Sequence, residues 1–408
     1  MKIAYFIGIY PLLTETFILN EIIGFQLQNI SGEIFCLYKN KSKILPSQIK
    51  KLTWRVQFFA SKILVKRTFF SLMGAWTLLF FRQPKVAFCV LAELIKCKDI
   101  NLMRLLIKSA PISLRLISGS FDVLYTHFGG QQAELVRVLS NITGIPYGFS
   151  FEEEEIFVSP SNIGNKIHQA TFVFTRTKSI RNFLINTYNL CVSDKRKIHI
   201  LYTVGVDTKL FKPRKVKGNR VFTIILVGRL EEMKGVHILL QACSRLRDTG
   251  LKFRCIIVGS GSWRSKLKTR INKLHLRSLV RLYGARNHDA VPYLLNTSNV
   301  FVLPSIIDRT GNRDAFPYAA QEAIASGLPV ITSDISGVAE IAKKSPFMVL
   351  VEPGNIDQLA EKILFIAMLN RFSCMKFCKD NARFARERLS IEYNSQTIVR
   401  FMQNELRL

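Results

Sequence analysis

The sequence predicts an α/β protein with two doubly wound parallel sheets. Its 408 residues are enough for two domains, and its hydrophobic content of 48% supplies two cores. Short runs rich in Val, Ile and Phe recur along the chain. Each run passes through Gly or Ser into a longer amphipathic segment. This alternation is typical of parallel strands that lead into helices.

The alternation is clearest in the second half of the chain. Strands are expected there at residues 222–228, 253–259 and 300–303. In the first half, strands are expected at residues 2–10, 33–38, 121–126, 145–150, 171–176 and 198–202.

A polar and basic segment, Lys212–Asn219, separates the two halves and predicts a domain boundary. We therefore expect a first domain over residues 1–212 and a second over residues 213–385, followed by a terminal helix over 386–408. The first domain includes a basic and aromatic, mostly helical region over residues 40–118.

Glycines and cations follow the expected strands of the second domain. Gly228 and Arg229 end the first strand and Lys234 follows, while Gly259 and Gly261 end the next. Doubly wound sheets bind ligands at the carboxyl ends of their strands, where backbone N–H groups and helix dipoles favour anions. Glycine also lets the backbone approach a phosphate closely. These residues predict a phosphate-binding site.

A segment with two carboxylates completes this site. Asp314, Phe316 and Pro317 lead into an expected helix that carries Glu322. Cations suit a diphosphate and carboxylates suit sugar hydroxyls, so the combination suits a nucleotide sugar.

In this order, these motifs resemble the donor-binding domain of GT-B glycosyltransferases of family 4. The whole chain is most similar to the colanic acid and amylovoran type of exopolysaccharide enzyme. The resemblance implies two Rossmann-like domains facing a cleft, with the terminal helix crossing back to the first domain. It also implies a retaining reaction without metal, in which Arg229 and Lys234 stabilise the leaving diphosphate. Asp314 would then lie near the donor sugar, and Glu322 would bind the ribose.

The start of the chain also resembles this type of enzyme. The segment Pro11–Glu21 matches a loop and helix that face the cleft in the family. Thr14, Glu15 and Thr16 are therefore candidate contacts to the acceptor or the diphosphate. The alternative is that they only cap the following helix.

His127 follows an expected strand and precedes two glycines. The family has a similar His-Phe-Gly element that lines the cleft, which makes His127 a candidate catalytic residue. The alternative is a histidine that caps or packs.

Residues 150–156 depart from the family pattern, which is Thr-Ala-His-x-x-Asp-Ile. In this chain Glu152 stands at the His position, where the family contacts the donor sugar, and Glu155 stands at the Asp position. A carboxylate near a diphosphate repels it unless it is protonated or turned away. If the segment binds substrate, three outcomes are open: a different sugar contact, an imidazole supplied by His127, or weak activity. The alternative is that the segment is only a solvated acidic loop.

The formal charge of +29 is concentrated in part of the first domain. Residues 34–92 contain eleven Lys and Arg, no Asp or Glu, and many Phe and Trp residues. Basic and aromatic residues interleaved on helices suit an anionic membrane surface. The alternative is a helical subdomain with solvated lysines. Nucleic acid is not expected as a partner, because no zinc-finger spacing, RRM-like motif or heptad-backed basic region occurs.

The sequence contains no sign of a secretory signal, a membrane-spanning run or paired cysteines. No Asp-x-Asp motif occurs, so neither a metal nor another cofactor is expected. We expect a cytoplasmic protein at the inner face of the plasma membrane.

The expected function is a retaining glycosyltransferase that moves a sugar from a UDP- or GDP-sugar to a lipid-linked saccharide. The product would enter bacterial exopolysaccharide, capsule or lipopolysaccharide. The alternatives are a GT-B sugar-nucleotide epimerase and a catalytically inactive, membrane-associated partner protein.

Overall fold

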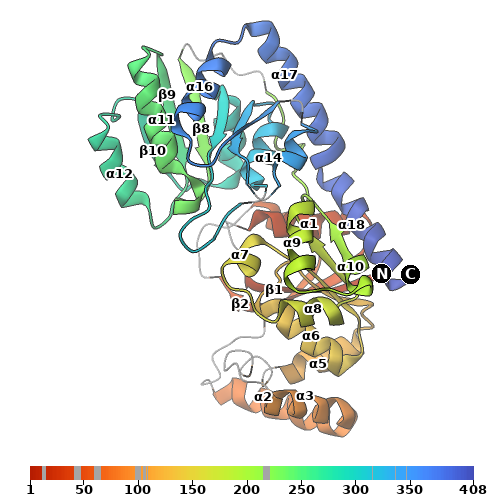
Figure 1. Cartoon of the computed structure of the whole chain (residues 1–408). Helices are drawn as coiled ribbons and strands as arrows, with labels where there is room; N and C mark the ends of the chain where they lie inside the picture. Colours follow the sequence, from red (N-terminus) through yellow and green to blue (C-terminus); the bar gives the residue numbers. More distant parts are fainter. Residues whose placement is uncertain are drawn as a thin grey trace. The chain divides into compact units, whose positions relative to one another are not determined.

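The computed structural model describes residues 1–11, 15–40, 47–58, 66–96, 103, 107, 109–214, 221–314, 316–335, 337–345 and 347–408. Within these residues the chain forms a seven-stranded and a six-stranded parallel sheet (Figure 1), which confirms the predicted fold class. The chain divides into two compact units. The first comprises residues 1–175, 181–200 and 396–408, and the second comprises residues 176–180 and 201–395.

The sheet of the first unit has the strand order β3-β2-β1-β4-β5-β6-β7. Its strands are β1 (Lys2–Tyr10), β2 (Ser31–Lys39), β3 (Arg55–Phe58), β4 (Val123–Thr126), β5 (Tyr147–Ser150), β6 (Phe172–Thr175) and β7 (Ile198–Ile200). The prediction of a mostly helical stretch over 40–118 missed β3, which pairs in parallel with β2. Its tetrapeptide Arg-Val-Gln-Phe is too short to show a strand period in the sequence.

Helices surround this sheet. They are α1 (Thr16–Leu27), η1 (Ser47–Lys51), α2 (Lys66–Arg82), α3 (Pro84–Lys96), α5 (Ser109–Ser118), α6 (Gln131–Thr143), α7 (Glu153–Phe157), α8 (Ile163–Gln169) and α10 (Val192–Lys197). Two more helices, α9 (Lys178–Thr187) and α18 (Ile391–Leu406), contribute residues to both units.

The end of α18 is part of the core of the first unit. Met402 is fully buried, and the Phe401 ring stacks on His199 of β7 with the ring centroids 4.5 Å apart. The His199 Nε2 atom lies 3.0 Å from a carboxylate oxygen of Glu405.

The sheet of the second unit has the strand order β10-β9-β8-β11-β12-β13. Its strands are β8 (Phe222–Val227), β9 (Phe253–Val258), β10 (Val280–Gly284), β11 (Val300–Leu303), β12 (Val330–Ser333) and β13 (Met348–Val351). The order reverses between β8 and β11, and this switch point is where sheets of this kind bind their ligands.

The helical segments of the second unit follow its strands. They are η2 (Glu232–Lys234), α11 (Val236–Asp248), α12 (Arg264–Lys273), η3 (His288–Ala290), α13 (Val291–Asn296), α14 (Tyr318–Ala325), α15 (Ala339–Ala342), α16 (Ile356–Ala367), α17 (Arg371–Phe384) and the π-helix η4 (Ala385–Leu389). The apolar strand residues are buried between these helices and form one continuous core. Within the described residues, every helix is too short or too polar to span a lipid bilayer.

Candidate functional site

The loops at the carboxyl ends of β8 and β11 pack backbone against backbone. Gly235 has a φ of +62°, and a Cβ atom there would lie 1.7 Å from the carbonyl oxygen of Pro304. No other residue fits this position, because a side chain would collide with the main chain of the neighbouring loop. Gly235 therefore places η2 and its Lys234 beside the end of β11.

Gly259 and Gly261 allow the same kind of close backbone contact after β9. A Cβ atom on Gly259 would lie 1.8 Å from the carbonyl oxygen of Gly228, and one on Gly261 would lie 2.5 Å from that of Leu230. Gly228 differs, because a Cβ atom there would meet only the Lys234 side chain, at 3.9 Å. The absence of a side chain at Gly228 leaves space above β8, as a closely bound ligand would need.

Lys234 and Asp314 form an ion pair at this switch point. The Lys234 ammonium donates to both carboxylate oxygens of Asp314, at 2.6 and 2.8 Å, and each side chain is 12% exposed. The Ser305 hydroxyl donates to the same carboxylate at 2.9 Å. The structure thus brings together two of the predicted catalytic residues, eighty positions apart in the chain.

Arg229 is exposed at the end of β8. In the part of the chain that the structure describes, no carboxylate lies within ion-pair distance of its guanidinium. An incoming anion therefore meets a cation at Arg229 whose charge is not already neutralised. The second cation, Lys234, would have to leave Asp314 to bind the anion, or bind the anion and Asp314 at the same time.

Glu322 of α14 is buried and lies against a histidine that the sequence analysis did not select. His288 Nε2 is 2.7 Å from a Glu322 carboxylate oxygen. Burial is the largest influence on His288 and lowers its pKa, but the Glu322 carboxylate and the charges of Asp289 and Asp207 outweigh it, and the pKa is raised. The predicted ribose contact is therefore a buried carboxylate paired with an imidazole. Only the position of His288 shortly after β10 could have indicated this.

Phe316 and Pro317 have structural positions. The Phe316 side chain is part of the hydrophobic core of the second unit. Pro317 is the residue immediately before α14, where a fixed φ suits the start of a helix. Between Asp314 and Glu322, these two residues fix where the helix begins.

His127 lies at the end of β4 between two carboxylates of the first unit. Its Nδ1 atom is 2.8 Å from an oxygen of Glu21 on α1, and its Nε2 atom is 2.9 Å from an oxygen of Glu152. Both contacts can be hydrogen bonds in two cases. Either each ring nitrogen carries a proton, or one nitrogen carries a proton and the carboxyl group beside the other nitrogen is protonated. The ring thus bridges the two carboxyl groups, one at each of its nitrogen atoms.

Glu21 is the buried centre of this group. It accepts hydrogen bonds from the Tyr5 hydroxyl of β1 and from the Tyr125 hydroxyl of β4, the latter at 3.0 Å. Sequence analysis missed Glu21 because it lies inside an apolar helical run, where nothing local distinguishes a buried acid from an exposed one.

The departure at residues 150–156 is not a solvated acidic loop. Glu152 precedes α7, and a carboxylate oxygen of Glu155 accepts from the Glu152 backbone N–H at 2.9 Å and from that of Gly129 at 3.3 Å. Burial raises the pKa of Glu155 to about 8. The Lys166 ammonium donates to the Gly129 carbonyl at 2.5 Å, and burial lowers its pKa to about 8. The sequence analysis did not select Lys166 either.

The remaining predicted contacts lie at the start of α1. Glu15 is the N-cap residue and makes no capping hydrogen bond through its side chain, and Thr16 is buried in the first turn. Thr14 lies outside the described residues.

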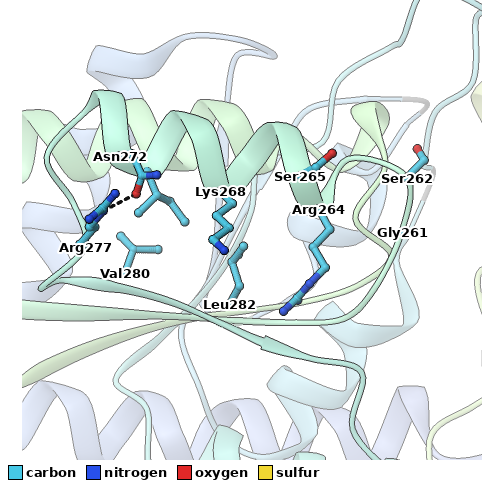
Figure 2. Close-up of a pocket in the computed structure, with 10 residues that line it drawn as sticks. Gly261, Ser262, Arg264, Ser265, Lys268, Asn272, Arg277, Val280 and Leu282 are labelled. Carbon is cyan, nitrogen blue, oxygen red and sulfur yellow. Dashed lines mark hydrogen bonds between the residues drawn. The ribbon is translucent and has the colours of Figure 1, made fainter.

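A separate basic groove follows the edge strand β10 of the second unit (Figure 2). Its volume is about 890 Å³, and it is lined by α12 and β10. Figure 2 shows Arg264 and Lys268 over an apolar floor that includes Val280 and Leu282, with Arg277 donating to Asn272 at 2.5 Å. Of the predicted site residues, this groove includes only Gly261, so it is not the site around Lys234.

Solved structures identify the fold. Anabaena HepE, solved in complex with UDP-glucose, aligns over 99% of this chain and 100% of its own, with a TM-score of 0.71 and 15% identity. A glycosyltransferase from Rickettsia africae ESF-5 aligns over 100% and 98%, with a TM-score of 0.69 and 15% identity. Likeness at this identity shows the fold, and the fold is GT-B.

Sequence comparison then identifies the group. Residues 207–385 match the model of glycosyl transferases group 1. The putative colanic acid biosynthesis glycosyltransferase WcaL of Escherichia coli K12 is 27% identical over 98% of each chain. The amylovoran biosynthesis glycosyltransferase AmsK of Erwinia amylovora is 33% identical over 35% of each chain. Residues 207–385 are thus of the glycosyl transferases group 1 type, within a chain that has the GT-B fold, and this confirms the resemblance seen in the sequence.

A third relative acts on a lipid-linked sugar according to its name. The UDP-Gal:α-D-GlcNAc-diphosphoundecaprenol α-1,3-galactosyltransferase of Escherichia coli is 25% identical over 66% of this chain and 72% of its own.

Proposed function

We propose that the protein transfers a sugar from a UDP- or GDP-sugar to a lipid-linked saccharide, with retention, in the synthesis of a bacterial exopolysaccharide, capsule or lipopolysaccharide. The observation that carries the proposal is the ion pair of Lys234 and Asp314 at the switch point of the second sheet, with the exposed Arg229 in the same loop as Lys234. The names of the relatives support the class of product, and the diphosphoundecaprenol-linked substrate of one of them supports the class of acceptor.

The donor diphosphate is proposed to bind Arg229 and Lys234. Negative charge grows on the diphosphate as the bond to the anomeric carbon breaks, and fixed cations stabilise that charge. These side chains would do this work without a metal ion. When Lys234 binds the diphosphate, the Asp314 carboxylate is released from its ion pair with Lys234. It then becomes available to the hydroxyls of the donor sugar.

Glu322 is proposed to bind the ribose, and His288 to hold it in place. The 2.7 Å contact between them fixes one carboxylate oxygen and leaves the other for a hydroxyl group. His288 would thus position Glu322 without touching the nucleotide.

In the first unit, Glu152 and His127 are proposed to contact a substrate sugar. Glu21 is buried and receives two tyrosine hydroxyls, so it fixes the orientation of the His127 ring. Glu152 is the partly exposed end of this group, with 20% of its side chain accessible. A carboxylate that is hydrogen-bonded to an imidazole repels a phosphate less than a lone carboxylate does.

Helices α2 and α3 are proposed to hold the protein at the inner face of the plasma membrane. They expose large apolar side chains, among them Phe81 at 84%, Phe88 at 65% and Ile95 at 86%. Arg82 and Lys85 are exposed and lie in the same helices. Apolar side chains among basic ones suit the headgroup region of an anionic bilayer.

A nucleotide-binding measurement tests the donor site. Thermal unfolding would be recorded with UDP, GDP, ADP and their sugar conjugates. A ligand at about 100 times its dissociation constant adds roughly 2.7 kcal/mol, a shift of a few degrees. We expect UDP or GDP compounds to shift the wild type and not the Arg229→Ala/Lys234→Ala variant.

The variant Lys268→Ala/Lys273→Ala removes the same charge from the exposed face of α12 and should keep the shift. If no nucleotide shifts the folded wild type, the proposal is wrong and the non-catalytic partner protein replaces it. If a bound nucleotide sugar is converted without any acceptor, the epimerase replaces it.

A further inference from the structure

Three potential metal ligands converge in the first unit, and none of them has been assigned a role above. His168 lies near the end of α8, Cys191 precedes α10, and Asp194 lies in the first turn of α10. These two helices lie side by side (Figure 1). One ligand atom from each residue falls within 4.8 Å of the other two, and no other such group occurs in the part of the chain that the structure describes.

Two of these ligands meet the same oxygen of the third. The Asp194 Oδ2 atom is 3.2 Å from His168 Nδ1 and 3.1 Å from Cys191 Sγ. Its other oxygen lies 3.4 Å from the Lys197 ammonium, which also donates to the His168 carbonyl at 2.6 Å. The carboxylate is thus oriented from behind, as metal-binding carboxylates are by their outer hydrogen bonds.

Burial and charge suit an ion at this point. The Asp194 side chain is buried, whereas His168 and Cys191 are exposed to solvent and accessible to an incoming ion. An ion from solvent can therefore reach the two exposed ligands, while the buried carboxylate is held in place by its hydrogen bonds.

We propose that His168, Cys191 and Asp194 bind a divalent transition metal ion and that Zn²⁺ is the ion they suit best. Nitrogen, thiolate and carboxylate ligands are those of zinc sites, and water would complete a tetrahedron. The Cys191 thiol would lose its proton to solvent, and the ring proton of His168 would move from Nδ1 to Nε2. A thiolate, a carboxylate and Zn²⁺ then sum to zero charge.

The competing explanation is that Cys191 is only the N-cap residue of α10, where its side chain makes no capping hydrogen bond, and that its thiol only donates to Asp194. Serine is a favoured N-cap residue whose hydroxyl can donate to Asp194 in the same way, but it cannot supply a thiolate. Cys191→Ser therefore keeps the start of the helix and removes the ligand, and this makes it the decisive variant. Cys89 on α3 is also a free, exposed cysteine, so Cys89→Ser serves as its matched control.

The full-length protein, stripped of metal, would be titrated with Co²⁺ and then with Zn²⁺. We expect a thiolate-to-cobalt charge-transfer band and the visible absorption of tetrahedral cobalt in the wild type and in Cys89→Ser, both abolished when Zn²⁺ displaces Co²⁺. In Cys191→Ser the band should be lost and the affinity should fall by more than about tenfold. His168→Gln should also weaken binding.

Binding without a charge-transfer band, or equal binding by Cys191→Ser and the wild type, would show only adventitious metal on the surface and overturn the proposal. None of these measurements depends on a donor or an acceptor being known.

Discussion

At the level of single residues, the buried glutamates differ in the groups that donate hydrogen bonds to them. Glu21 contacts tyrosine hydroxyls and an imidazole, and Glu322 contacts an imidazole. Among the described residues, the hydrogen-bond donors to Glu155 are backbone N–H groups alone. Burial therefore raises the pKa of Glu155 to about 8, and the protonated form is favoured in the folded protein. A raised folded-state pKa contributes stability that is full at low pH and is lost as the pH rises through the folded value.

The first prediction concerns Glu155→Gln. The contribution of Glu155 to the free energy of unfolding is complete below about pH 4.5 and is lost by about pH 8. The glutamine variant carries no such titration, so it should gain stability relative to the wild type as the pH rises from about 5 to about 7.5, between the unfolded and folded pKa values. The change is on the order of a few kcal/mol. Urea unfolding of both proteins at several pH values measures it, and parallel stability profiles would contradict the raised pKa.

The second prediction separates Lys234 from Asp314. Lys234→Met should weaken nucleoside diphosphate binding by about 2 kcal/mol, roughly thirtyfold, because a charge-assisted hydrogen bond is lost. Asp314→Asn frees the ammonium, so it should leave nucleoside diphosphate binding intact or strengthen it, while weakening the preference for the nucleotide sugar. Isothermal titration with a nucleotide and its sugar conjugate shows both effects. Equal losses in the two variants would mean that the ion pair acts only structurally.

Close backbone contacts decide the geometry at the level of elements. The second sheet brings its loops together only because Gly235, Gly259 and Gly261 lack side chains. These contacts join the ends of neighbouring strands and thereby place η2 beside the end of β11. The cost of substitution there depends on the contact and not only on the backbone angle.

The third prediction compares two glycines that have similar backbone angles. Gly235 has a φ of +62°, and a Cβ atom there would lie 1.7 Å from a carbonyl oxygen, whereas Gly250 has a φ of +80° and a Cβ atom there would meet nothing within 4 Å. Gly250→Ala should cost about 1–2 kcal/mol, the strain of a left-handed residue. Gly235→Ala should cost several kcal/mol more and abolish nucleotide binding. Similar unfolding midpoints for the two variants would show that the loops are not packed as described.

Strands and glycine loops could be predicted from the sequence, whereas contacts between distant segments could not. The runs 222–228 and 300–303 are locally apolar and β-branched, and the structure has strands there. The contact between His288 and Glu322 spans 34 positions, and that between His127 and Glu21 spans 106. No local pattern connects them, because they exist only once the sheet brings its strands side by side.

The basic and aromatic helices matter at the scale of the whole molecule. Helices α2 and α3 belong to the first unit, whereas the proposed donor site belongs to the second. Membrane binding and nucleotide binding should therefore be separable by mutation. The net charge of +29 adds a general attraction to anionic surfaces.

The fourth prediction concerns Phe81→Ser/Phe88→Ser. Binding to vesicles that contain anionic lipid should fall, because two exposed rings no longer enter the interface. Nucleotide binding should be unchanged. The control Phe365→Ser/Phe372→Ser removes two exposed rings from α16 and α17 of the second unit and should keep vesicle binding. Sedimentation with vesicles at low and high salt gives the result, and equal binding by both variants would contradict a membrane function for α2 and α3.

The end of α18 has a consequence for how the chain is made. Residues 396–408 complete the first unit, with Met402 buried in its core and the Phe401 ring stacked on His199 of β7. Roughly 200 residues separate them from the rest of that unit, and at about 5–20 residues per second a ribosome needs on the order of 10–40 s to synthesise them. During that interval the newly made first unit lacks one of its packing surfaces. All residues of the second unit are synthesised before residues 396–408 of the first unit. We therefore expect the second unit to fold before the first unit is complete.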